Sequence, residues 1–240
     1  MDIEIIESNS HHCCKIGENV AYFHFSFADY YNPNRMNLGT LRVFNEYLFQ
    51  TNPHHFGHNS LRDIELVTLV IDGELIYKNN KGIHETVHAG DLFTVSCGIG
   101  VISSVHVPMP VKLIEVWVFP SKYSLKPSFQ KLHVDAEECT NTILQIINSE
   151  KKSNNVSGLK IHQDANFYMT KLGPEKEIEH YAEPERKMYL FVIAGKVSIN
   201  NNFDMGQRDA AIITFSSSET IHLKNRALGS TDLILIDLAK

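Results

Sequence analysis

The sequence predicts an all-β protein built from two copies of one β-barrel domain. Three observations lead to this prediction. Short segments rich in β-branched and aromatic residues recur along the 240-residue chain, Gly, Pro, Asn and Asp separate them, and one hairpin-like pattern occurs twice. Many short strands between turn residues, with little helical periodicity, are typical of sandwiches and barrels.

The expected strands follow one another through both halves of the chain. Each contains mostly β-branched, aromatic or other apolar residues, and turn-forming residues lie close to its ends. The expected strands cover residues 22–27, 41–49, 64–71, 74–78, 92–96, 111–119, 187–199, 210–215, 220–224 and 232–238.

One pattern of strands and turns occurs in both halves. Residues 69–77, LVIDGELIY, and 191–199, FVIAGKVSI, each place an apolar strand before a turn at Gly73 or Gly195 and a second strand after it. A Gly/Asp element and a further apolar strand follow each copy. A recurring supersecondary unit indicates a duplicated domain.

The segment between the two halves allows two interpretations. Asp135 and Glu138 have the spacing of a capping box at the start of a helix. The apolar residues of 143–147 fit a buried strand equally well, because periodicity does not separate the two in so short a run. Residues 149–158, SEKKSNNVSG, are polar, and we expect a linker or long loop near the domain boundary.

Composition excludes several classes of function. Acidic residues outnumber Lys and Arg by 28 to 22, which argues against direct nucleic-acid binding through a broad phosphate-contacting face. The first ten residues lack the layout of a signal peptide, and no apolar run is long enough to cross a bilayer. Four cysteines in 240 residues do not make a disulfide framework, so we expect a cytoplasmic protein without membrane contact.

Longer segments resemble the pirin family of two-domain cupins. The resemblance runs through residues 25–49, 63–82, 87–106, 115–122 and 158–172, and so covers nearly the whole chain. It implies a bicupin, with two jelly-roll-like β-barrels stacked face to face. We expect an N-terminal domain over 1–135 and a C-terminal domain over 136–240. The resemblance also favours a strand over a helix for residues 141–148.

Metal-holding pirins carry one divalent iron or nickel ion in the N-terminal barrel, on three histidines and one glutamate. Several of them resemble quercetin 2,3-dioxygenases. Imidazole and carboxylate ligands suit a first-row divalent ion and leave positions open for substrate and oxygen. Here the aligned ligand positions carry no such group, so we expect no metal cofactor and a pocket lined by the substituted residues. These residues are Asn59, Leu61, Ser103 and Val105.

An alternative is a displaced iron or nickel site. His58 and His106 lie one residue outside the aligned ligand positions, and His54 or His55 would complete the set. A shift of one residue turns a side chain to the other face of a sheet, so this site would need a β-bulge at each place. We therefore favour a pocket without bound metal.

Other residues have a structural interpretation beside a functional one. Glu65 is expected near the pocket, either holding a water or ligand or already paired. Cys97 is expected close to the pocket as a small buried residue. Cys13 and Cys14 in HHCC are expected in a surface segment, and Trp117 in the core. The second-half histidines His162, His180 and His222 are expected to be structural or on the surface.

The leading hypothesis is a small-molecule-binding, sensing or protein-interaction module, with no catalytic side chains and with a monomer favoured. The ligand or protein partner is unidentified. One alternative is a quercetin 2,3-dioxygenase-like oxygenase that uses the displaced histidines. The other is a transcriptional co-regulator acting through protein contacts, by analogy with eukaryotic pirins.

Overall fold

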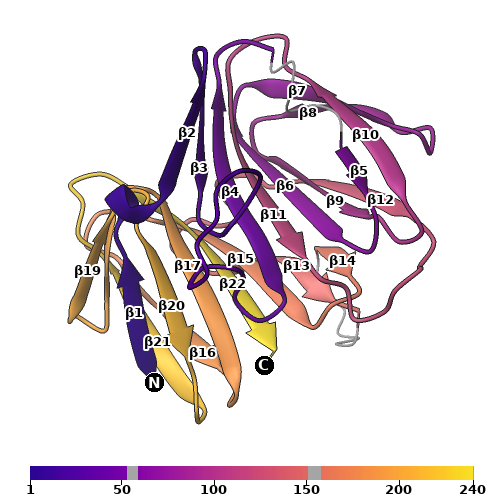
Figure 1. The fold of residues 1–240 in the computed structure, drawn as a ribbon. Coiled ribbons are helices and arrows are strands. Elements are labelled where there is room, and N and C mark those ends of the chain that lie inside the picture. The colour runs from indigo at the N-terminus through magenta and orange to yellow at the C-terminus, as the bar shows by residue number, and fades with distance from the viewer. Residues whose placement is uncertain (53–58, 151–157, 240) are drawn as a thin grey trace. The chain divides into compact units, whose positions relative to one another are not determined.

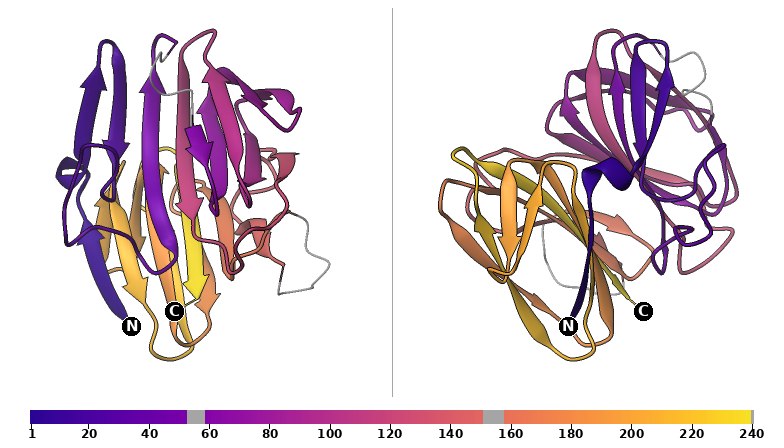
Figure 2. Two further views of the ribbon diagram at one scale, coloured as in Figure 1. Left: turned by 45° about the vertical axis from the view of Figure 1, so that its right-hand side comes forward. Right: turned by 60° about the vertical axis from the view of Figure 1, so that its left-hand side comes forward.

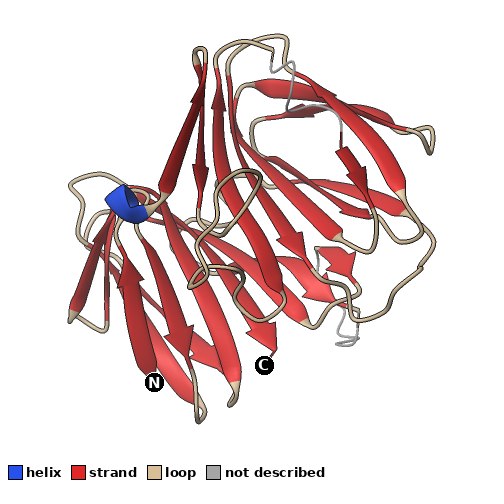
Figure 3. Ribbon diagram, viewed as in Figure 1, coloured by secondary structure: helices blue, strands red, loops and turns tan. Residues whose placement is uncertain are grey.

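A computed structural model describes residues 1–52, 59–150 and 158–239. The described chain is almost entirely strand, as Figure 3 shows, with one short 3-10 helix, η1 (Ser8–Ser10). The all-β prediction is therefore confirmed. No helix within the described ranges is long and apolar enough to cross a membrane.

The chain divides into two compact units (Figure 1). The N-terminal unit comprises residues 12–134 and 159–163, and the C-terminal unit comprises residues 1–11, 135–158 and 164–240. Two short segments thus belong to the unit formed by the other half of the chain. One is the first strand, which lies among the strands of the C-terminal unit in Figure 2.

The N-terminal unit has two antiparallel sheets. The long sheet has the strand order β12-β9-β6-β11-β4-β3-β2, and the short sheet has the order β5-β10-β7-β8. The strands of this unit are β2 (His12–Ile16), β3 (Asn19–Phe23), β4 (Leu41–Phe49), β5 (Asn59–Leu61), β6 (Glu65–Asp72), β7 (Glu74–Asn79), β8 (His84–His88), β9 (Asp91–Ser96), β10 (Val101–His106), β11 (Val111–Val118), β12 (Ser128–His133) and β14 (Leu159–Ile161).

The C-terminal unit repeats this arrangement. Its long sheet includes strands in the order β1-β20-β17-β22-β15-β13, and its short sheet has the order β16-β21-β18-β19. Its strands are β1 (Asp2–Ile6), β13 (Leu144–Ser149), β15 (Ala165–Leu172), β16 (Glu177–Ala182), β17 (Arg186–Ala194), β18 (Lys196–Ile199), β19 (Phe203–Gly206), β20 (Ala210–Thr214), β21 (Glu219–Asn225) and β22 (Thr231–Ala239).

The repeated sequence pattern occupies the same place in both units. Gly73 joins β6 to β7 and Gly195 joins β17 to β18, and both have a positive φ, +78° and +86°. A Cβ atom on Gly73 would overlap the carbonyl oxygen of Pro110, and one on Gly195 would overlap Thr231. Only glycine fits these turns without strain, because it adopts a positive φ readily and has no Cβ atom to overlap the neighbouring strand.

Each unit has its own hydrophobic core, formed by the strand residues that point inward at every second position. The ambiguous segment before the linker forms strand β13, so the strand interpretation is confirmed and the capping-box interpretation is wrong. The strand expected over residues 22–27 ends at Phe23 instead. There Ser26 Oγ donates to the carbonyl oxygen of Asn32 and accepts its N–H, which closes a turn.

Candidate ligand-binding site

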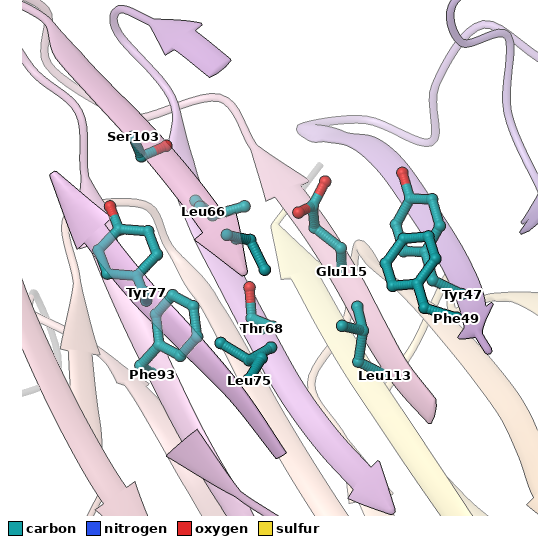
Figure 4. Close-up of a pocket in the computed structure, with 11 residues that line it drawn as sticks. Tyr47, Phe49, Leu66, Thr68, Leu75, Tyr77, Phe93, Ser103, Leu113 and Glu115 are labelled. Atoms are coloured by element: carbon teal, nitrogen blue, oxygen red, sulfur yellow. The ribbon is translucent and has the colours of Figure 1, made fainter. Parts of the chain in front are cut away.

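The N-terminal unit contains a cavity lined by side chains from both of its sheets (Figure 4). Its volume is about 420 Å³ when the solvent at its entrance is included. The centre of a water molecule can occupy about 20 Å³ of this space. This inner space holds about one ordered water. The lining residues come from β4, β6, β7, β9, β10 and β11, and are Tyr47, Phe49, Leu66, Thr68, Leu75, Tyr77, Phe93, Ser103, Val105, Leu113 and Glu115.

Aromatic rings form two walls of this cavity. On β4 the rings of Tyr47 and Phe49 stack with centroids 5.3 Å apart. On the other side Tyr77 meets Phe93 at 4.9 Å, and Phe129 stacks behind both rings. Such walls offer apolar surface and π faces to a bound molecule.

Two phenol oxygens bring polarity into the cavity. The Tyr47 oxygen accepts a hydrogen bond from Asn45 Nδ2 at 2.9 Å, and the Tyr77 oxygen accepts one from Asn79 Nδ2 at 3.3 Å. Ser103 is also hydrogen-bonded to Tyr77. Burial raises the pKa of both phenols above its ordinary value. Both therefore stay neutral at physiological pH and act as hydrogen-bonding groups.

Glu115 is the charged residue of the cavity lining. In Figure 4 its carboxylate and the two phenol oxygens point toward the same end of the cavity. Its Oε1 accepts a hydrogen bond from the indole N–H of Trp117 at 2.9 Å. Burial raises the pKa of Glu115 from 4.5 to about 7, against the opposing effect of the Trp117 hydrogen bond. At neutral pH this carboxyl is thus poised between its acidic and ionised forms.

The duplicated fold provides an internal comparison for these positions. Thr68 and Leu190 each lie five residues before the equivalent glycine turn. Thr68 pairs with Glu115 on β11, and Leu190 pairs with Leu235 on β22. The carboxyl of the N-terminal unit is therefore replaced by a leucine in the C-terminal unit.

The equivalence extends to the short sheets. Tyr77 and Ile199 each lie four residues after the glycine, where they pair with Val105 and Leu223. Ser103 then corresponds to Ile221, two residues before Leu223. In the C-terminal unit the equivalents of Glu115, Thr68, Tyr77 and Ser103 are hydrocarbon side chains, all fully buried in the core. The polar lining is thus a property of one copy and is not required by the fold.

The four aligned ligand positions lie on two paired strands. Ser103 and Val105 line the cavity. On the neighbouring strand β5, Asn59 pairs with Ser103 and Leu61 pairs with Val101. Leu61 is partly buried and packs against the same core as Val105.

The chemistry of these positions does not fit a divalent iron or nickel ion. Leu61 and Val105 carry no donor atom, and the Ser103 hydroxyl is a weak neutral ligand. Within the described part of the chain, no group of three or more His, Cys, Asp or Glu side chains is placed to hold a metal ion.

His106 stands at the end of β10 and is exposed. Because it follows Val105 directly on the strand, its side chain is on the face away from the cavity. The other members of the alternative metal set, His54, His55 and His58, lie outside the described residues.

Glu65 is not among the cavity-lining residues, although it is 1% exposed. It precedes Leu66 on β6 and points to the opposite face. Its Oε2 accepts the backbone N–H of His162 at 2.6 Å. Glu65 thus joins β6 to the segment 159–163. Of the two roles expected for Glu65, holding a ligand or pairing within the protein, this hydrogen bond corresponds to the second.

Cys97 is buried in the core of the N-terminal unit. Burial raises the pKa of its thiol to about 12, and the nearby Glu65 and Glu115 carboxylates contribute. The thiol is therefore protonated at neutral pH, and the thiolate needed for nucleophilic or redox chemistry is scarce. Cys13 and Cys14 are free cysteines on β2, the first exposed and the second half-buried.

Two histidines of the C-terminal unit, His180 and His222, contact neighbouring side chains. His180 is buried against Tyr168 with ring centroids 4.9 Å apart, and burial lowers the pKa of His180. His222 is on the surface, 3.3 Å from Glu179. The contact of His180 is part of the packing of the unit, and the contact of His222 lies on its surface.

Family comparisons match the two halves of the chain separately. Residues 7–118 match the family described as pirin, and residues 146–238 match the quercetinase C-terminal cupin domain. The chain belongs to the pirin family. A quercetin 2,3-dioxygenase of Escherichia coli K12 is 28% identical over 217 residues, 89% of each chain. A pirin-like protein of Caulobacter vibrioides is 28% identical over 221 residues, 91% of this chain and 92% of the other.

Solved pirins have the same fold. The bacterial pirin YhhW from Escherichia coli in complex with nickel(II) aligns over 99% of both chains, with a TM-score of 0.87 and 24% identity. Another crystal structure of YhhW aligns over 99% of this chain and 97% of that one, with a TM-score of 0.88. The bicupin architecture expected from the sequence is thus confirmed, with open jelly-roll-like sheets in each unit.

Sequence reasoning missed Glu115, as it missed the phenols of Tyr47 and Tyr77. Glu115 lies in VKLIEVWV, residues 111–118, which is otherwise an apolar strand. A single carboxylate at a partly buried position of such a strand is a signal in itself, because removing a charge from water without a partner costs free energy. The hydrogen bond from Trp117, two residues on, uses the same face of the strand.

Proposed function

We propose that this pirin is a binding or sensing module whose N-terminal cavity takes a small organic molecule without a bound metal ion. The observation that carries the proposal is the polar lining of the cavity, at positions where the second copy of the fold has a hydrocarbon core. An apolar cavity with a few converging polar groups is the usual form of a small-molecule site.

The arrangement suits binding better than catalysis. The phenols of Tyr47 and Tyr77 are neutral, and the Cys97 thiol is protonated. The side chains of the cavity supply hydrogen-bonding groups, one carboxyl and aromatic walls. They thus offer orientation and selectivity to a bound molecule.

Native mass spectrometry of the chain purified from its own host tests this function. We expect an added mass that is lost on denaturation. Thr68→Leu, which copies the C-terminal unit, should fill the cavity and remove the added mass. Thr86→Leu on the exposed face of β8 is the control and should retain it. An added mass retained by Thr68→Leu, or none in the wild type, would contradict the proposal.

The names of the curated relatives favour one second candidate, a quercetin 2,3-dioxygenase-like oxygenase. It would require an ion held by His58 and His106, together with His54 or His55. Elemental mass spectrometry after addition of iron or nickel tests this candidate. Near-stoichiometric metal that is lost in His58→Ala and His106→Ala, together with quercetin turnover, would support the oxygenase. A metal content close to zero would exclude it.

A further inference from the structure

The charge inside the cavity is unbalanced. Among the lining residues that the structure describes, Glu115 is charged and none is Lys, Arg or His. The ion pair between Lys112 and Glu46, at 3.0 Å, uses strand positions on the other face of the long sheet. Among the described residues Glu115 therefore has an indole N–H as its partner and no cation, and its ionised form is disfavoured.

The surrounding groups suit a positive charge. The rings of Tyr47, Phe49, Tyr77 and Phe93 present π faces, which attract cations. An anion would meet the carboxylate of Glu115 with no compensating charge. A neutral alcohol would gain one hydrogen bond, whereas a cation would also balance the partly buried charge of Glu115.

We propose that the N-terminal cavity binds a small organic cation of the alkylammonium class, with its nitrogen at Glu115 and its carbon chain against the aromatic walls. This inference rests on the proposed small-molecule function and specifies its ligand. The inner space is large enough for about one water. It therefore fits an ammonium group that displaces the water, while the alkyl part lies along the aromatic walls.

Binding should depend on pH through Glu115. The titratable groups around it are the phenol of Tyr47 on β4, the phenol of Tyr77 on β7 and the thiol of Cys97 after β9. The pKa of each is raised, so all three are uncharged at neutral pH. Strands β6, β9 and β10 contribute residues that do not titrate. Affinity for the cation should therefore fall about tenfold for each pH unit below the pKa of Glu115.

The experiment is an NMR titration of the full ¹⁵N-labelled chain with butylammonium, 1-butanol or butyrate at pH 6 and pH 8 and constant ionic strength. The variant is Glu115→Gln, which keeps the shape and the acceptor for Trp117. The control is Glu85→Gln on β8, which makes the same change of net charge outside the cavity. We expect butylammonium to bind the wild type and the control with about tenfold higher affinity at pH 8 than at pH 6. At pH 8 it should bind Glu115→Gln at least tenfold more weakly than the wild type.

Two results would overturn the inference, and they have different meanings. If 1-butanol or butyrate binds the cavity as well as butylammonium does, or if Glu115→Gln leaves the affinity for butylammonium unchanged, the ligand is not a cation but the small-molecule site stands. If none of the three probes shifts cavity resonances at millimolar concentration, the binding site itself is refuted. The pH dependence of the wild type tests the inference without any variant.

Discussion

At the scale of single residues, the cavity is defined by one carboxyl in an otherwise apolar strand. Family resemblance identified Ser103 and Val105, and both line the cavity. Glu115 was not predicted, because strand patterns record average polarity and this strand is apolar on both faces. Its importance depends on which side chains close around it, and the sequence alone does not provide that arrangement.

Glu115 should make stability depend on pH. Its folded-state pKa of about 7 lies above the ordinary 4.5, so the folded protein keeps a proton that the unfolded chain releases. The free energy of unfolding should thus fall as pH rises from about 4.5 to 7 and level off above. Relative to the wild type, Glu115→Gln should gain up to about 3 kcal/mol across this window. Urea unfolding at several pH values measures this difference, and a difference that does not vary with pH would refute it.

At the scale of elements, the strands are the best-predicted feature. Apolar content and turn residues were enough for β4, β6, β9 and β11, because these strands are buried and have turns at their ends. Strand β13 needed the family resemblance, since a short apolar run fits a helix as well. Strand β1, DIEII, alternates in polarity but was not recognised as a strand.

The turn between β6 and β7 should tolerate no side chain. Gly73→Ala would combine an unfavourable φ with overlap at Pro110, and we expect a loss of roughly 2 to 4 kcal/mol. Gly82→Ala is the matched control, because φ there is +89° and nothing lies within 4 Å of the added carbon. The control should lose only about 1 kcal/mol. Thermal unfolding followed by circular dichroism compares the two, and equal losses would show that the overlap is relieved.

At the scale of the whole molecule, the two copies of the fold differ in their interiors. Both units have equivalent strand orders, yet the C-terminal unit has a hydrocarbon core where the N-terminal unit has a cavity with a few polar groups. The repeated hairpin made the duplication predictable. The assignment of β1 to the C-terminal unit was not predictable, because its partner β20 lies about 200 residues further along the chain and no local pattern specifies so distant a pairing.

Strand β1 should therefore stabilise the C-terminal unit. Ile6 is 3% exposed, and Ile3 and Ile5 pack against the core of that unit. Deleting residues 2–6 should cost about 3 to 6 kcal/mol through the lost burial of these side chains. The double variant Asp2→Ala, Glu4→Ala alters only the exposed face of β1 and is the control. Similar unfolding temperatures for the deletion and the wild type would contradict this expectation.

The hydrogen bond from Trp117 to Glu115 has an optical consequence. Trp117 is the one tryptophan of the chain, so its fluorescence reports on a single place. Excitation of indole moves electron density from the pyrrole ring, which carries the N–H, toward the benzene ring. A negative charge on Glu115 therefore stabilises the excited state and shifts the emission to longer wavelength. The emission wavelength of Trp117 therefore reports the ionisation state of Glu115 without an added label.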